Sequence, residues 1–204
     1  MPGLFITFEG GDGSGKSTQQ RHLVDWLAAH GHTVVESREP GGTDLGVELR
    51  NIILHRRGYI APRAEALIYA ADRAHNIATK VRPAIEAGSI VVQDRYLDSS
   101  IAYQGAGRVL NPDEVRGISI WAAEGLLPDL TVLLDLDPEE GRARIKGGAY
   151  DRLEEELHDF HSRVRFAYLA LAEVDPARFL VLDATRPVDY LAAAIRARVS
   201  ALLT

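Results

Sequence analysis

A glycine-rich segment near the N-terminus narrows the range of possible folds at once. Residues 10–17 match the pattern G-x-x-x-x-G-K-[ST], with an apolar, β-branched run at 4–8 before them and helical spacing after them. Glycines allow successive backbone N–H groups to turn inward and form a nest for an anion, and a helix that starts at the nest adds its positive dipole end. The sequence therefore predicts a strand, a phosphate-binding loop and a helix, in that order.

The same loop carries side chains suited to a nucleoside triphosphate. Lys16 would place its charge against the β- and γ-phosphates of ATP, and the Ser17 hydroxyl would ligate Mg²⁺. The loop residues predicted to bind ATP are Gly10, Gly11, Asp12, Gly13, Ser14, Gly15, Lys16 and Ser17. A chance match is the alternative, and the flanking strand and helix argue against it. The loop alone leaves open what receives the phosphate.

Short apolar runs alternate with helical patterns along the rest of the chain. Strands are predicted at residues 4–8, 33–35, 90–92, 131–134 and 179–182. Their apolar residues are consecutive, which is typical of strands covered on both faces. Between and after them, three- and four-residue apolar steps at 160–172 and 191–202 indicate helices. We predict a single α/β domain spanning 1–204, with a mostly parallel sheet and helices on both faces.

Composition excludes several classes of protein. The 204 residues are 46% hydrophobic, which suits one domain with a proper core. The chain has no cysteine, so disulfides and thiolate metal sites are excluded. A net charge of −6 argues against a nucleic-acid partner. No apolar run approaches the roughly 20 residues of a membrane span, and no secretion signal is evident. We therefore expect no membrane partner and a cytoplasmic location.

A second group of charged residues follows the predicted strand at 90–92. Residues just beyond the carboxyl end of a parallel strand face the ligand crevice, so Asp94 would hold Mg²⁺ opposite Ser17. Arg95 would bind a phosphate bidentately. The alternative is a structural ion pair at a strand end. Asp135 and Asp137 form another acidic pair, but Asp137 precedes a proline and two acids and is interpreted as a helix N-cap.

Several segments together resemble the thymidylate kinase family. Residues 9–18 match its phosphate loop E-G-x-[DE]-G-x-G-K-[ST]-T, residues 38–43 match R-E-P-G-G-T, and residues 94–105 match D-R-Y-x-x-S-x-x-A-Y-Q-G. Further matches at 128–131, 151–154 and 183–185 keep the family's order. The resemblance implies Mg²⁺-dependent transfer of the ATP γ-phosphoryl group to dTMP, giving dTDP for dTTP synthesis. It also implies a P-loop fold with a five-stranded parallel sheet, a mobile lid and a homodimer.

The resemblance assigns roles to individual residues. Tyr69, where the family usually has phenylalanine, would stack on thymine, and Arg73 would hydrogen-bond the base. Tyr103 would lie under the sugar and leave no room for a 2′-hydroxyl. An isolated tyrosine and arginine at this spacing would otherwise be interpreted as a half-buried aromatic and a solvated cation. The remaining expected contacts are Ser100 and Gln104, in a loop facing the base; Asp12, Glu39, Arg50 and Arg95 on the acceptor; and Thr18, Ala184 and Thr185 on ATP.

The lid, at about residues 142–153, is expected to supply a catalytic arginine. Some relatives carry an arginine within the phosphate loop, at the position of Gly13, and this chain does not. Our hypothesis is that lid closure brings Arg144 or Arg152 onto the transferred group and excludes water. Lys16, Asp12 and Arg95 would complete the catalytic set.

Two other functions remain open from the sequence. The chain could be a kinase of the same build that acts on a deoxynucleoside or on a different monophosphate. It could also be a nucleotide-dependent switch or an ATPase subunit. Against a switch, the sequence lacks the base-recognition motif N-K-x-D of GTPases and a suitably placed glutamine.

Overall fold

The computed structural model describes residues 3–56, 58–145, 152–153 and 156–203. Its strands form one five-stranded parallel sheet in the order β2-β3-β1-β4-β5. The strands are β1 (Phe5–Glu9), β2 (Val34–Arg38), β3 (Ile90–Asp94), β4 (Leu130–Asp135) and β5 (Phe179–Asp183). All five predicted strands are confirmed, with ends that differ by at most three residues. The parallel five-stranded sheet and the α/β class are also confirmed.

The largest difference from the predicted strands is at β2. Its polar second half, Glu36 to Arg38, pairs with β3 in register from Val92 to Asp94. Pairing with a neighbouring strand thus extends β2 beyond its apolar residues. The expectation that every strand is covered on both faces is right for β1, β3 and β4 and wrong for β2 and β5. Those two strands lie at the edges of the sheet, where fewer elements cover them.

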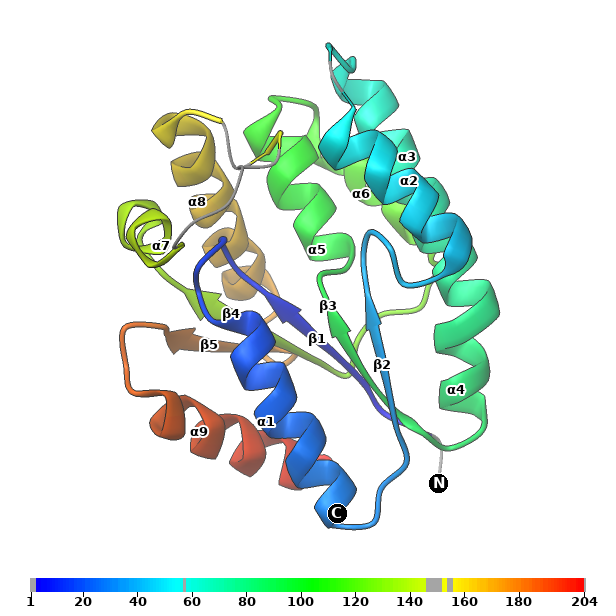
Figure 1. Cartoon of the computed structure of the whole chain (residues 1–204), viewed down its shortest axis with the longest axis vertical. Helices are drawn as coiled ribbons and strands as arrows, with labels where there is room; N and C mark the ends of the chain where they lie inside the picture. The colour runs from blue at the N-terminus through cyan, green and yellow to red at the C-terminus, as the bar shows by residue number, and fades with distance from the viewer. Residues whose placement is uncertain (1–2, 57, 146–151, 154–155, 204) are drawn as a thin grey trace.

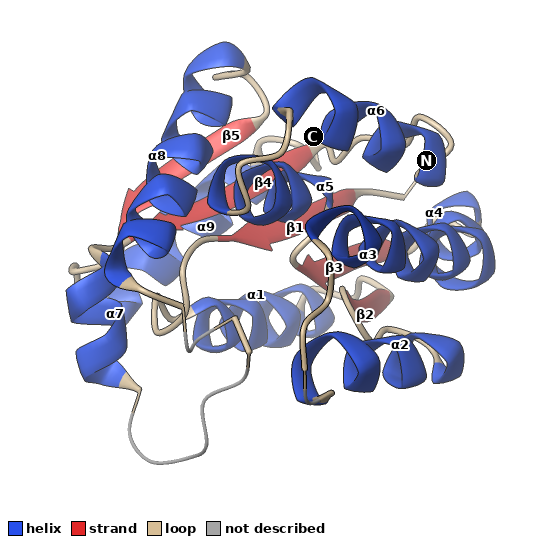
Figure 2. Ribbon diagram, turned by 90° about the horizontal axis from the view of Figure 1, so that it is seen from above, coloured by secondary structure: helices blue, strands red, loops and turns tan. Residues whose placement is uncertain are grey.

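Helices cover both faces of the sheet, as the view from above shows (Figure 2). The α-helices are α1 (Lys16–Ala29), α2 (Asp44–His55), α3 (Pro62–Asn76), α4 (Arg82–Glu86), α5 (Leu97–Ser100), α6 (Pro112–Ala122), α7 (Pro138–Arg144), α8 (His158–Val174) and α9 (Val188–Ser200). Two π-helices, η1 (Ile77–Val81) and η2 (Ile101–Gly107), continue α3 and α5. Within the described residues, no helix is long and apolar enough to cross a bilayer.

The strand side chains alternate between two layers. Ile6 and Phe8 of β1 point to the face covered by α1 and α9, where they pack in one cluster with Leu23 and Ile195. These two helices lie side by side (Figure 1). Phe5 points to the opposite face, which packs against η1, α5 and η2. The sheet is therefore buried between two helical layers, and its carboxyl edge remains available for ligands.

Residues 97–107 are helical, whereas the sequence led us to expect a loop that carries Ser100 and Gln104. Ser100 ends α5, and Gln104 lies in η2. The Arg108 amide donates to the Tyr103 carbonyl at 2.9 Å, five residues back, which is the π-helical spacing. π-Helical turns are rare and occur frequently at functional sites, where the wider turn changes the direction of the side chains. The helix satisfies the backbone groups that a buried loop would leave unpaired.

Candidate active site

The carboxyl ends of β1 and β3 bring the two predicted phosphate-binding segments together. Phe8 pairs with Asp94, and the Arg95 amide donates to the Phe8 carbonyl at 2.9 Å. A cavity of about 410 Å³ opens at this edge of the sheet. Its lining includes most of the predicted site residues: Asp12, Gly13, Gly15, Lys16, Ser17, Thr18, Glu39, Arg50, Tyr69, Arg73, Asp94, Arg95, Ser100, Tyr103, Gln104 and Arg144.

The phosphate loop runs from β1 into α1. Gly13 and Gly15 have φ values of 75° and 92°, a left-handed region that costs glycine little. The first three residues of α1, Lys16 to Thr18, line the cavity, so the positive end of the helix dipole lies at it. The Lys16 ammonium donates to the Gly10 and Gly11 carbonyls at 3.1 and 2.9 Å. Burial lowers the pKa of Lys16, and the nearby charge of Arg95 lowers it further.

Arg95 links the end of β3 to this loop. Its backbone has φ 63°, which is strained for a residue with a Cβ and is found at functional sites. One guanidinium nitrogen pairs with Asp12 Oδ1 at 2.6 Å, and another donates to the Gly10 carbonyl at 3.1 Å. Burial opposes ionisation of Asp12, but the charges of Arg95 and Lys16 hold its pKa below the usual value. The arginine thus lies directly beside the phosphate loop.

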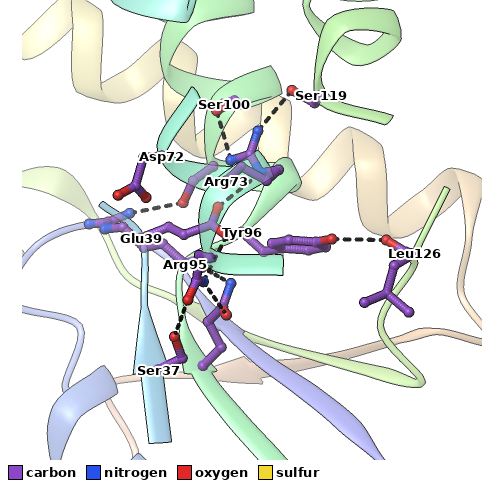
Figure 3. A network of polar contacts seen from close by, with 12 residues as sticks. Ser37, Glu39, Asp72, Arg73, Arg95, Tyr96, Ser100, Ser119 and Leu126 are labelled. Carbon is purple, nitrogen blue, oxygen red and sulfur yellow. Dashed lines mark hydrogen bonds and ion pairs between the residues drawn. The ribbon is translucent and has the colours of Figure 1, made fainter. Parts of the chain in front are cut away.

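Arg73 is buried at the other end of the cavity, with 1% of its surface exposed. Its Nε pairs with Glu39 Oε2 at 2.9 Å, and its two terminal nitrogens donate to Ser119 Oγ and Ser100 Oγ, each at 3.1 Å (Figure 3). Burial raises the pKa of Glu39 to about 7, although the Arg73 charge acts in the opposite direction. The interpretation of Arg73 as a solvated cation is therefore wrong. Tyr69, one helical turn earlier on α3, lines the same cavity.

The two lid arginines proposed for catalysis, Arg144 and Arg152, lie in different places. Arg144 lines the cavity and donates to the Ala184 carbonyl at 3.0 Å. Arg152 is absent from the lining; its Nε donates to the Ile53 carbonyl at 2.9 Å and its guanidinium pairs with Glu65. Ala184 and Thr185 also lie outside the cavity lining, and the Arg144 hydrogen bond connects Ala184 to it. Residues 146–151 of the predicted lid fall outside the described residues.

Comparison with known proteins identifies the family. A family model described as thymidylate kinase matches residues 8–195. The chain belongs to the thymidylate kinase family. A thymidylate kinase from Leifsonia xyli subsp. xyli is 68% identical over 97% of this chain and 94% of its own length. One from Clavibacter michiganensis subsp. michiganensis is 63% identical over 100% of this chain and 97% of its own length. The crystal structure of thymidylate kinase from Ehrlichia chaffeensis superimposes with a TM-score of 0.80 at 28% identity, covering 98% of this chain and 99% of that one.

The glycine at position 13 of the phosphate loop has a steric basis. A Cβ on Gly13 would lie 2.2 Å from the Gly141 carbonyl oxygen, and one on Gly141 would lie 2.4 Å from the Asp12 carbonyl oxygen. Backbone atoms cannot move aside as the end of a flexible side chain can. In this chain the loop and α7 are therefore packed too closely for an arginine at position 13.

The residues at the cavity fit a magnesium ion held mainly by phosphates. Asp94 Oδ1 is buried and has no hydrogen-bond partner in the part of the chain that is described, and Ser17 is exposed at the same cavity. Among the described residues, no group of three or more His, Cys, Asp or Glu could hold a metal. Mg²⁺ commonly uses one or two protein oxygens together with phosphates and water, so a smaller protein contribution suffices.

The other acidic pair has the structural role that its sequence predicts. Asp137 Oδ1 accepts from the Glu139 amide at 2.9 Å and caps α7, with Pro138 in the first turn. Arg165 pairs with Asp135 at 2.7 Å and with Asp137 at 3.1 Å. Both carboxylates are therefore already engaged, in the cap of α7 and in ion pairs with Arg165 of α8.

Sequence reasoning gave no role to Glu9, a buried carboxylate beside the site. Glu9 accepts from the Tyr96 amide at 2.8 Å, from Ser99 Oγ at 2.5 Å and from the Tyr168 hydroxyl at 2.9 Å. Burial and the neighbouring charge of Asp98 raise its pKa to about 7. A glutamate directly before the glycine-rich loop could have pointed to a polar role for Glu9. Its partner Tyr168 could not be recognised, because it occupies one of the apolar positions of its helix.

Proposed function

We propose that the cavity at the carboxyl edge of the sheet transfers the γ-phosphoryl group of ATP to dTMP, giving ADP and dTDP. The observation that carries the proposal is that Lys16, at the start of α1, and Arg95, directly after β3, line one cavity. Membership of the thymidylate kinase family supports the same reaction. In it, an oxygen of the dTMP phosphate bonds to the γ-phosphorus while the bond from that phosphorus to the β-bridging oxygen breaks.

The donor side is formed by the phosphate loop. Residues 10–18 would hold the ATP phosphates with backbone amides, and Lys16 would stabilise charge on the γ-phosphoryl oxygens as the transition state forms. Ala184 and Thr185 would lie near the adenine. Ser17 and Asp94 are the protein groups proposed to hold Mg²⁺, which when bound would neutralise charge on the β- and γ-phosphates.

The acceptor side is formed by β3, α3 and η2. Arg95 would bind the dTMP phosphate, with Arg50 assisting, and Asp12 would contact the sugar 3′-hydroxyl or the magnesium shell. Tyr69 would stack on thymine, and Arg73, held by Glu39 and Ser100, would donate to the base. Of the lid residues, Arg144 is the stronger candidate for the catalytic arginine because it lines the cavity, whereas Arg152 pairs with Glu65.

A coupled ADP-release assay with ATP, Mg²⁺ and each nucleoside monophosphate in turn tests the proposal. We expect dTMP to give the highest kcat/KM. Equal ADP release without any acceptor would instead support an ATPase or a switch. A preference for a different monophosphate, or for a deoxynucleoside, would support a kinase of the same build that acts on that acceptor.

Tyr103 is expected to set the preference for a deoxy sugar. Its ring is buried under the cavity, and the Arg95 guanidinium lies 5.0 Å from the ring centroid. Tyr103→Ala should open space for a 2′-hydroxyl and lower the ratio of kcat/KM for dTMP over its ribonucleotide at least tenfold, whereas Tyr103→Phe should preserve it. The two substrates are compared in the same coupled assay. A ratio that alanine leaves unchanged would remove Tyr103 from this role.

The homodimer and the cytoplasmic location stay predictions. Supporting the dimer, α3 and α6 pack together and expose Leu67 and Trp121, the latter with 80% of its surface accessible. Apolar side chains gathered on neighbouring helices are typical of an interface. Sedimentation of the wild type and of Trp121→Asp tests this: we expect a dimer that the substitution weakens, and a monomeric wild type would contradict it.

A further inference from the structure

A buried carboxylate beside the cavity has no part in the reaction proposed above. Glu65 lies in the first turn of α3 and has no exposed surface. Its Oε1 accepts from Gln104 Nε2 at 2.9 Å and from Arg108 Nε at 3.2 Å, and its Oε2 pairs with Arg152. Side chains from η2, from the residue that ends it and from the lid therefore meet at one side chain of α3.

The charges around Glu65 determine what it can do to Gln104. A carboxylate that is paired with two guanidinium groups is ionised, and an ionised carboxylate only accepts hydrogen bonds. The end of the Gln104 amide that faces Glu65 must therefore be its NH₂ group. The amide carbonyl oxygen is then the end left for the cavity that Gln104 lines.

The adjoining donor is fixed in the same way. Each of the three nitrogens of the Arg73 guanidinium donates one hydrogen bond, to Glu39, Ser100 or Ser119. Its remaining N–H groups can only donate, because a guanidinium has no acceptor atom. The cavity thus presents a fixed donor from Arg73 and a fixed acceptor from Gln104. Thymine and uracil offer the complement, a C4 carbonyl and an N3–H. Cytosine offers a 4-amino donor and an N3 acceptor, which oppose both.

We propose that Glu65 is a positioning residue for base selection, because it holds the Gln104 amide with its oxygen toward the ring nitrogen of the substrate and so excludes cytosine. The inference rests on the proposed function, since it specifies how the same acceptor site tells one pyrimidine from another. Without the carboxylate the amide could rotate by half a turn and present its NH₂ group, which matches cytosine N3.

Glu65→Gln tests this, because a glutamine can present either oxygen or NH₂ to Gln104 and no longer dictates its orientation. We expect the ratio of kcat/KM for dTMP over dCMP to fall at least tenfold. Glu65→Asp keeps a group that only accepts and should retain most of the ratio. The matched control is Glu156→Gln, which removes the other carboxylate paired with Arg108 and leaves the contact with Gln104 intact. It should leave the ratio unchanged.

The outcomes separate a positioning role from a purely structural one. A structural role would lower activity toward both nucleotides by the same factor and leave their ratio intact, which would overturn the inference. An equal fall of the ratio in Glu156→Gln would also overturn it. A wild type that does not phosphorylate dTMP would refute the proposed function itself, which is a different result.

A measurement on the wild type covers the case in which Glu65→Gln does not fold. A neutron structure with bound dTMP locates the deuterons of the Gln104 amide. We expect one of them directed at Glu65 and the amide oxygen directed at thymine N3. An amide turned the other way, with its nitrogen toward the base, would overturn the inference.

Discussion

Lys16→Ala should lower kcat by about 10³ or more while the fold is retained. The ammonium group lies buried at the end of the phosphate loop, where its charge is poorly screened and, in the proposed reaction, would face the transferred group. Among the described residues its hydrogen-bond partners are the neutral Gly10 and Gly11 carbonyls, so its loss removes no partner of a buried ion pair there. The measurements are steady-state kinetics with ATP and dTMP, and thermal unfolding.

Arg21→Ala is the matched control for this substitution. Arg21 is exposed on the same helix, outside the lining of the cavity, and its removal should leave kcat within about twofold. If Lys16→Ala retained turnover close to that of the control, the phosphate loop would not have the role assigned to it here.

Arg144→Ala should have the second large effect, lowering kcat by about 10³ or more, the lower end of the range for an arginine that stabilises a transferred phosphoryl group. Arg144 lines the cavity together with Lys16 and Arg95, and no phosphate-loop arginine can replace it because Gly13 lies against α7. Rapid-quench measurement of the first turnover separates chemistry from product release.

Arg152→Ala is the informative comparison, because Arg152 pairs with Glu65 and contacts the Ile53 carbonyl. We expect a smaller change in kcat than for Arg144→Ala. If neither substitution lowered kcat by about 10³, the hypothesis of a catalytic lid arginine would be wrong. If Arg152→Ala alone did so, the catalytic role would pass to Arg152.

Local sequence patterns predicted the parts of the site that depend on a few consecutive residues. The phosphate loop is one of these, because glycines, a strand before and a helix after are sufficient to define it. The five strands were also predicted from their apolar runs, and the end of β2 was not, since its polar residues are held by pairing with β3. The β-strand propensity of single residues is a weak guide to where a strand ends when a neighbouring strand supplies the hydrogen bonds.

The remaining parts depend on contacts between distant segments. Nothing in the residues around Glu65 indicates that Gln104, Arg108 and Arg152 would meet it. The four are brought together by packing of α3 against η2 and against the end of the lid. The same holds for Tyr168, which lies in the buried apolar stripe of α8 and donates from its hydroxyl to Glu9. The π-helical turn that carries Tyr103 and Gln104 also has no simple sequence signature.

A crystal structure with a bisubstrate analogue, adenosine and thymidine joined through a chain of phosphates, would decide whether one cavity holds both nucleotides. We predict that Lys16 and Arg95 contact the same phosphate chain from opposite ends, with thymine beside Tyr69 and Arg73. Contacts from Lys16 and Arg95 to separate molecules in separate cavities would contradict it.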